Sequence, residues 1–161
     1  MTVTIRPLTE TDALTSYKWR NDPEVFKYTG RTYDHEIDIE CETKWLREVL
    51  NHPSEYRCAI LADDVYIGNI YLTNITTNSA TFHIFIGEKS YWGKGVAKRA
   101  SKEMLNYAFN VLGLSSVELY VKEENEPAKK LYERLGFVKK SVEGEWVRML
   151  LLNENYSHGN Q

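Results

Sequence analysis

A glycine-rich turn between a strand-like segment and a helical segment constrains the fold of this chain most strongly. Residues 81–86 (TFHIFI) are aromatic and β-branched, which favours a strand. After the turn at residues 91–97 (YWGKGVA), apolar residues recur at helical spacing. The sequence therefore predicts a strand, a turn and a helix in direct succession. The first N–H groups of such a helix have no partner within it and carry the positive end of its dipole, which suits an anion such as a phosphate.

Composition limits the class of protein. The chain has 161 residues, 42% hydrophobic and 27% charged, which is typical of one globular domain. The formal net charge of −3 argues against a nucleic-acid binder, because such proteins are usually basic. Cys41 and Cys58 lack metal-ligand spacing and fit free thiols in a reducing compartment. No apolar run approaches the ~20 residues that span a bilayer. We expect one cytoplasmic domain over residues 1–152 and a polar tail over 153–161, with no metal and with neither nucleic acid nor membrane as partner.

The remaining elements follow from apolar periodicity and from turn residues. Asp63 and Asp64 form a connection short enough for a hairpin, and Gly113 and Gly136 are placed to end helices. The predicted architecture is a mixed sheet with helices on both faces. The expected strands are residues 3–6, 56–61, 65–72, 81–86, 117–121, 137–138 and 146–152, and the expected helices are about residues 12–20, 38–50, 96–112 and 126–135.

Two common phosphate motifs do not fit the glycine turn. A P-loop has Gly-Lys-Ser/Thr, whereas Lys94 is followed by Gly95 and then Val96, so no hydroxyl is available for magnesium. A dinucleotide fingerprint needs a third small residue at the position of Lys98. Another kind of phosphate compound is therefore indicated.

The turn and a second segment together resemble the GNAT acyltransferase superfamily. The acyl-CoA motif of that family is Gln or Arg, two residues, Gly, one residue, then Gly or Ala. Residues 92–97 match it except at Trp92. The second signature consists of an Asn, a short helix, a Tyr and Gly-Phe. It is matched by Asn125, Tyr132 and residues 136–137. The Tyr-Trp-Gly-Lys-Gly form is similar to the branch of ribosomal-protein N-terminal, small-amine and amino-sugar acetyltransferases.

This resemblance implies a fold and an activity. The fold is α/β, with a mixed, mostly antiparallel sheet of six to seven strands and helices on both faces. The activity is that of an acetyl-CoA-dependent N-acetyltransferase, in which a small-molecule amine or a peptide N-terminus attacks the thioester directly in a ternary complex. An acyl group longer than acetyl and a homodimeric assembly are left open. The alternative is a non-catalytic acyl-CoA-binding or regulatory module, because Thr81 stands where many relatives carry a carboxylate.

The resemblance also implies where acetyl-CoA binds. Backbone groups of Phe85 and Ile86 are expected to pair with the pantetheine arm. Asn125 is expected to bond the same arm, to cap the helix that follows it, or both. Charge-assisted bonds from the turn are expected to hold the pyrophosphate. The residues concerned are Gly93, Lys94, Gly95, Val96, Ala97 and Lys98.

Catalysis needs a proton donor for the leaving thiolate and an acceptor for the amine proton. The resemblance makes Tyr132 the general acid, since a phenol with a pKa of ~10 stays protonated at neutral pH. Its alternative is a core aromatic residue. His83, with an ordinary pKa of ~6.5, is the candidate base. Glu88, otherwise expected to cap the turn, and a chain of waters are the alternatives.

The acceptor site is expected to form from the first helices and the loop between Pro23 and Glu36. The stretch at residues 34–42 is acidic, which would favour a cationic amine such as a polyamine. A solvated helix face explains the same charges. The five residues concerned are Asp34, Glu36, Asp38, Glu40 and Glu42.

Overall fold

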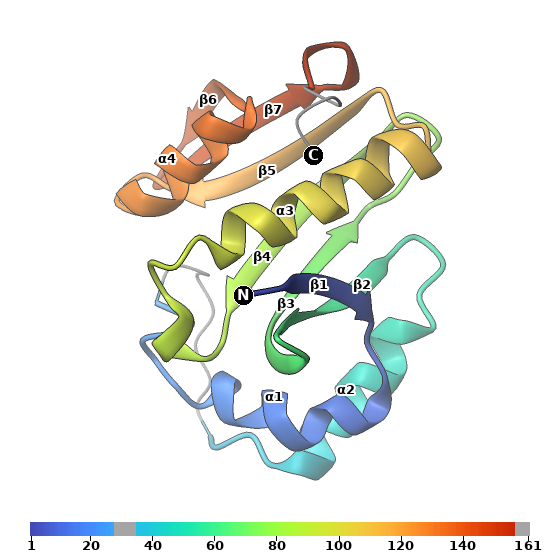
Figure 1. Ribbon diagram of the computed structural model, residues 1–161, viewed down its shortest axis with the longest axis vertical. Coiled ribbons are helices and arrows are strands. Elements are labelled where there is room, and N and C mark those ends of the chain that lie inside the picture. Colours follow the sequence, from blue (N-terminus) through green and yellow to red (C-terminus); the bar gives the residue numbers. More distant parts are fainter. Residues whose placement is uncertain (28–34, 157–161) are drawn as a thin grey trace.

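The computed structural model describes residues 1–27 and 35–156, which form a seven-stranded sheet in the order β1-β2-β3-β4-β5-β7-β6 (Figure 1). Every neighbouring pair is antiparallel except β4 with β5. The predicted mixed, mostly antiparallel sheet is confirmed. The strands are β1 (Val3–Pro7), β2 (Tyr56–Ala62), β3 (Val65–Thr73), β4 (Ser79–Ile86), β5 (Ser116–Lys122), β6 (Val138–Glu143) and β7 (Trp146–Leu152).

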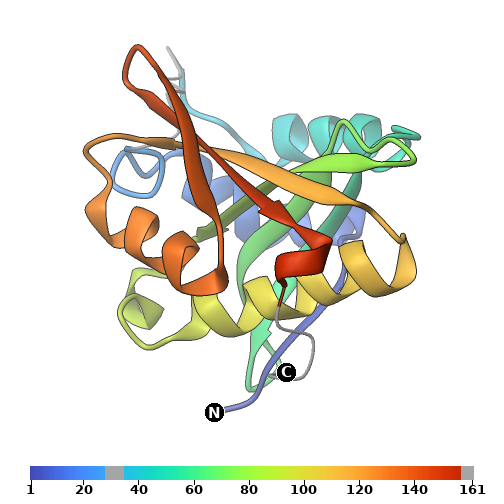
Figure 2. The same cartoon turned by 90° about the horizontal axis from the view of Figure 1, so that it is seen from above.

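Four α-helices in the described residues cover the two faces of the sheet: α1 (Ala13–Arg20), α2 (Ile39–Leu50), α3 (Val96–Asn106) and α4 (Glu126–Leu135). Alternation along β2 shows the two layers. Cys58 and Ile60 belong to the main core under α3 and α4, whereas Ala59 and Leu61 pack with Leu46 of α2. Figure 2 shows α3 and α4 on one side of the sheet and α1 and α2 on the other.

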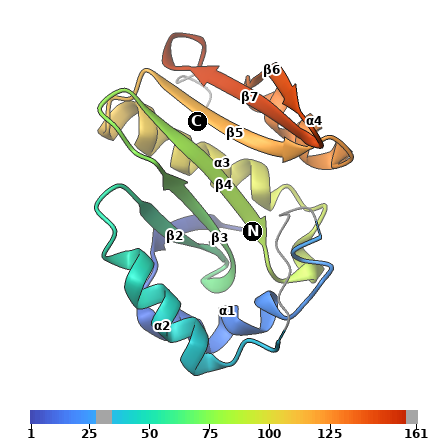
Figure 3. The same ribbon diagram turned by 180° about the vertical axis from the view of Figure 1, so that it is seen from behind.

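The centre of the sheet opens where β4 and β5 diverge. Their parallel pairing covers only three residues of each strand, from Ser79 with Ser116 to Thr81 with Glu118. Beyond Thr81 the two strands separate, as Figure 3 shows from behind. The other edge of β4 stays paired with β3 as far as Ile86. The second half of β4 therefore has one edge that no described strand covers.

Capping and turn residues fix the start of α2 and the connection between β2 and β3. Asp38 caps α2, because its Oδ1 accepts the Cys41 N–H at 2.7 Å. Asp63 and Asp64 both have positive φ, 48° and 68°, as a type I′ hairpin turn requires.

Two elements differ from the predictions by more than two residues. After Asn106 the expected continuous helix becomes a π-helical turn, Tyr107–Val111, before Gly113. Strand β6 is longer than predicted. All six of its residues are exposed, so its sequence lacks the apolar alternation by which a strand is recognised.

Candidate active site

The glycine turn leaves the N-terminus of α3 open. Gly93 and Gly95 have φ values of 74° and 78°, a conformation that side chains with a Cβ rarely adopt. Gly95 is the N-cap of α3 and offers no side-chain acceptor to the first turn. The first helical bond runs from the Arg99 N–H to the Gly95 carbonyl, at 3.3 Å. The N–H groups of residues 96–98 are thus placed as an anion site requires, and the exposed Lys94 and Lys98 add positive charge.

The two residues predicted to pair with pantetheine face different ways. A Cβ placed on Gly68 of β3 would lie 2.4 Å from the Phe85 carbonyl oxygen, so this carbonyl points toward β3. The Ile86 carbonyl instead accepts the Trp92 indole N–H at 2.9 Å. Trp92, which departs from the acyl-CoA motif, therefore ties the glycine turn to the end of β4. Contact of Phe85 and Ile86 with pantetheine stays a prediction.

Asn125 acts as a helix cap. Its Oδ1 accepts the Ala128 N–H at 3.3 Å, and Pro127 stands in the first turn of α4. A cap of this kind fixes the start of α4 and so the position of Tyr132 two turns later. A bond from Asn125 to the cofactor stays a prediction.

Tyr132 lies on α4 and is buried, with 8% exposure. Its ring meets Phe82 of β4 edge-on, with centroids 6.2 Å apart, so α4 brings the phenol to the place where β4 leaves β5. Burial raises the pKa of Tyr132, and the nearby Tyr71 side chain raises this pKa further. A raised pKa keeps the phenol protonated over the whole neutral range.

His83 lies on β4 directly beside Tyr71 of β3. The two rings stack with centroids 4.6 Å apart and planes 10° apart, and the His83 Nε2 lies 2.9 Å from the Thr73 hydroxyl. Sequence reasoning missed Tyr71. The hairpin between residues 65–72 and 81–86 carried the signal, because antiparallel register pairs position 71 with position 83.

Glu88 occupies the N-cap position of the short 3-10 turn Lys89–Tyr91, and its carbonyl accepts the Tyr91 N–H at 3.0 Å. Its side chain makes no capping bond. The Glu88 carboxylate instead accepts the Trp19 indole N–H at 3.2 Å. Thr81 is buried at the last point of β4–β5 pairing, and its hydroxyl is no base.

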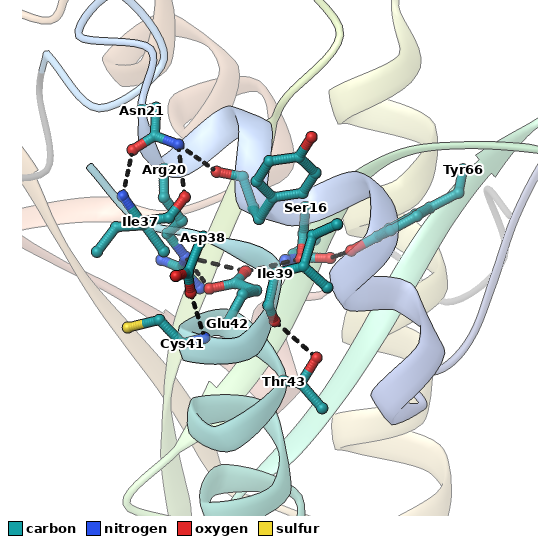
Figure 4. Close-up of polar contacts among 12 residues, drawn as sticks. Ser16, Arg20, Asn21, Ile37, Asp38, Ile39, Cys41, Glu42, Thr43 and Tyr66 are labelled. Atoms are coloured by element: carbon teal, nitrogen blue, oxygen red, sulfur yellow. Dashed lines mark hydrogen bonds and ion pairs between the residues drawn. The ribbon is translucent and has the colours of Figure 1, made fainter.

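The acidic stretch divides into different roles. Glu42 is buried, and its carboxylate accepts from the Ser16 hydroxyl at 2.7 Å and from Arg20 Nε at 3.2 Å (Figure 4). It is therefore neither a solvated charge nor a free acid for an amine. Asp38 caps α2, and Glu36 and Glu40 are exposed. Residues 28–34 of the predicted acceptor loop, Asp34 among them, lie outside the described residues.

Across residues 1–27 and 35–156, no three His, Cys, Asp or Glu side chains gather as metal ligands would. None of the described helices is both long and apolar enough to cross a membrane.

Comparison with known proteins agrees with this geometry. The family model for the acetyltransferase (GNAT) domain matches residues 2–138. The chain is 33% identical over 156 residues to spermidine N(1)-acetyltransferase of Escherichia coli K12, covering 96% of this chain and 81% of that protein. It is similar to the structure of spermidine N-acetyltransferase from Vibrio cholerae in complex with CoA and spermine. The TM-score is 0.85 with 26% identity, over 96% of this chain and 97% of the other. A second structure of the Vibrio cholerae enzyme, 24% identical with a TM-score of 0.79 over 99% and 98% of the two chains, is dodecameric.

Proposed function

This chain belongs to the GNAT acetyltransferase family and is an acetyl-CoA-dependent N-acetyltransferase, and we propose that it acetylates a primary amine of a polyamine. The observation that carries the acetyl-transfer activity is a buried Tyr132 at the divergence of β4 and β5, combined with the open N-terminus of α3. The similarity to spermidine acetyltransferases over nearly the whole chain supports the acceptor class. A peptide N-terminus, the acceptor in the ribosomal-protein branch, is the second candidate.

The residues at the turn suit the pyrophosphate of acetyl-CoA. Positive φ at Gly93 and Gly95 exposes backbone N–H groups, and a Cβ added at either glycine would meet no atom within 4 Å. The backbone is therefore accessible to a large anion from outside. We assign the pyrophosphate to Gly93, Lys94, Gly95, Val96, Ala97 and Lys98, and the pantetheine arm to Phe85, Ile86 and Asn125.

The catalytic residues act on two protons. Acetyl-CoA supplies the thioester that the amine attacks directly, so that a C–N bond forms and the C–S bond breaks. Tyr132 gives its proton to the departing sulfur, and the environment of the phenol keeps this proton in place until then. His83 takes the proton that the amine must lose, and the rigid β3–β4 pairing supports its position.

An assay of thiol release from acetyl-CoA tests the proposal. The purified protein is offered spermidine, spermine, small monoamines, amino-sugar nucleotides and peptides, and we expect the highest kcat/KM with a polyamine. A peptide as the best substrate would move the acceptor to the second candidate. Tight binding of acetyl-CoA without turnover on any acceptor would support the non-catalytic module instead.

The acid role has its own variant. Tyr132→Phe is expected to lower kcat by about 10²-fold or more, with little change in the Kd of acetyl-CoA. The matched control is Tyr120→Phe, which changes an exposed tyrosine on β5. An unchanged kcat in Tyr132→Phe, under conditions where chemistry is rate-limiting, would remove Tyr132 from this role.

Two further properties belong to the proposal. We place the protein in the cytoplasm, where acetyl-CoA and polyamines are available together.

We also propose that it self-associates, with a homodimer as the smallest assembly, since the Vibrio cholerae relative is an oligomer. Light scattering after size exclusion tests this, and a monomer mass at every concentration would contradict it.

A further inference from the structure

Three neighbouring strands bring a row of cationic and aromatic side chains together beside the candidate base. Strand register aligns Arg57 of β2 with Tyr71 of β3, and Tyr71 with His83 of β4. Residues aligned in this way share one face of the sheet. This is the face of α2, because Arg57 also lies against the Trp45 ring, 5.1 Å from its centroid.

The row forms a continuous stack. The Arg57 guanidinium lies 4.2 Å from the Tyr71 ring centroid, and the Tyr71 ring lies nearly parallel to the His83 imidazole at 4.6 Å. Contacts at these separations are favourable for a cation over a ring and for stacked rings. Tyr71 is thus held between a cation on one side and the imidazole on the other.

The cation in this stack is itself fixed. Arg57 Nε donates to Glu55 Oε1 at 2.9 Å, and the two side chains are only 9% and 16% exposed. The guanidinium also lies between the Trp45 and Tyr71 rings. A buried, paired and stacked arginine is a rigid support, because few rotamers remain open to it.

We propose that Tyr71 is a positioning residue for acetyl transfer: its ring, supported by Arg57, fixes the plane of the His83 imidazole while the Thr73 hydroxyl fixes the rotation of that ring at Nε2. This inference rests on the proposed function, in which His83 accepts the amine proton. The stack restrains tilting of the ring, and the hydroxyl restrains its rotation. A base held in one orientation loses less entropy on reaching the transition state.

Two substitutions separate the ring of Tyr71 from its hydroxyl. Tyr71→Phe keeps the stack, and kcat for spermidine is expected to stay within about threefold of the wild type. Tyr71→Leu removes the stack, and kcat is expected to fall by about 10- to 100-fold, with KM for acetyl-CoA changed less than threefold, because misplacement of a reacting group costs rate and not cofactor binding. Equal losses in both variants, or full activity in Tyr71→Leu, would overturn the positioning role.

A matched control lies on the opposite face of the same sheet. Tyr56 of β2 stacks on Tyr107 with centroids 4.3 Å apart and planes 16° apart, in the core under α3. Tyr56→Leu removes a comparable stack away from His83, so we expect destabilisation without loss of kcat in the folded protein. A fall in kcat equal to that of Tyr71→Leu would make the Tyr71 effect a general one of stability and would overturn the proposal.

A spectroscopic readout tests the stack without turnover. The NMR signals of the His83 ring, assigned by their loss in His83→Gln, should be shifted upfield by the Tyr71 ring current. We expect this shift to persist in Tyr71→Phe and in Tyr56→Leu and to disappear in Tyr71→Leu. A wild type inactive on every amine would overturn the proposed function. An active wild type whose His83→Gln variant is equally active would overturn the positioning role alone.

Discussion

Two regions of the molecule use polar groups in opposite ways. One is the base of the loop between α1 and α2, formed by Arg20, Asn21, Ile37 and Glu42, which we call the neck. The other is the glycine turn before α3. In the neck, the Asn21 side-chain amide donates to the Ile37 carbonyl and accepts the Ile37 N–H, both at 2.7 Å. Arg20 and Glu42 form a buried ion pair beside it, as Figure 4 shows. In the turn, Gly95 begins a helix without any side-chain cap.

The contrast separates stability from binding. In the neck, Glu42 bonds to Ser16 and Arg20, and the Asn21 amide bonds to the Ile37 backbone, so changing Glu42 leaves buried partners unsatisfied. The helix terminus at the turn is available to a ligand, so a change there should affect binding more than folding. Substitutions in the two regions can test this division.

The largest effect is expected in the neck. Glu42→Gln leaves the Arg20 cation buried without its counter-charge, and we expect the free energy of unfolding to fall by about 3–5 kcal/mol. Urea denaturation measures this change. The side chains of Arg20 and Glu42 are only 6% and 3% exposed, so water cannot replace the lost partner.

The control for this pair is on the surface. Glu10 pairs with Arg47 at 2.8 Å, with side-chain exposures of 47% and 61%, and Glu10→Gln should cost less than about 1 kcal/mol. Similar losses in the two variants, or a Glu42→Gln protein with strongly weakened acetyl-CoA binding, would break the division between the regions.

The next effect concerns packing between the two regions. A Cβ on Gly87 would lie 2.0 Å from the Trp19 ring, so Gly87→Ala forces Trp19 away and should cost about 1–3 kcal/mol. Combining it with Trp19→Leu should recover part of this loss, since the clash is removed. Thermal unfolding of the two single variants and the double variant measures the coupling, and strictly additive losses would contradict a direct clash.

The effect of Gly95 should appear mainly in binding. Gly95→Ala keeps a positive φ at a cost of about 1 kcal/mol, and we expect the Kd of acetyl-CoA to rise about tenfold because the Cβ crowds the anion. Gly144, in the turn between β6 and β7, has a φ of 64° and also no atom within 4 Å of an added Cβ. Gly144→Ala should therefore cost similar stability without changing the Kd, and calorimetry distinguishes the two variants.

The smallest effect depends on pH. Burial alone would raise the pKa of Asp12, but bonds from Arg6 at 2.8 Å and from the Thr9 N–H outweigh it and lower this pKa. A lowered folded-state pKa stabilises the protein above the unfolded value of ~3.9 and loses this effect as the pH falls through the folded value. The stability difference between wild type and Asp12→Asn should therefore be constant near neutrality and shrink in acid. A difference that grows below pH ~4 would have the wrong sign.

The sequence by itself determined the features that depend on neighbouring residues. The glycine turn, the cap at Asn125 and the turn at Asp63-Asp64 follow from local backbone preferences, and the structure has each of them. The two motifs also indicated the family, because their residue types and spacing are local properties of the chain.

Only the tertiary structure decided which distant side chains meet. Glu42 lies in an acidic stretch that suggested a solvated face, yet α1 supplies Ser16 and Arg20 to it across more than twenty positions of the chain. Glu88 meets Trp19, α4 brings Tyr132 against Phe82, and the β3–β4 register stacks Tyr71 on His83. Periodicity predicts which face a residue occupies, whereas its partner depends on how the helices and strands pack. The charge of Glu42 and the role of Tyr71 therefore became interpretable only in the folded protein.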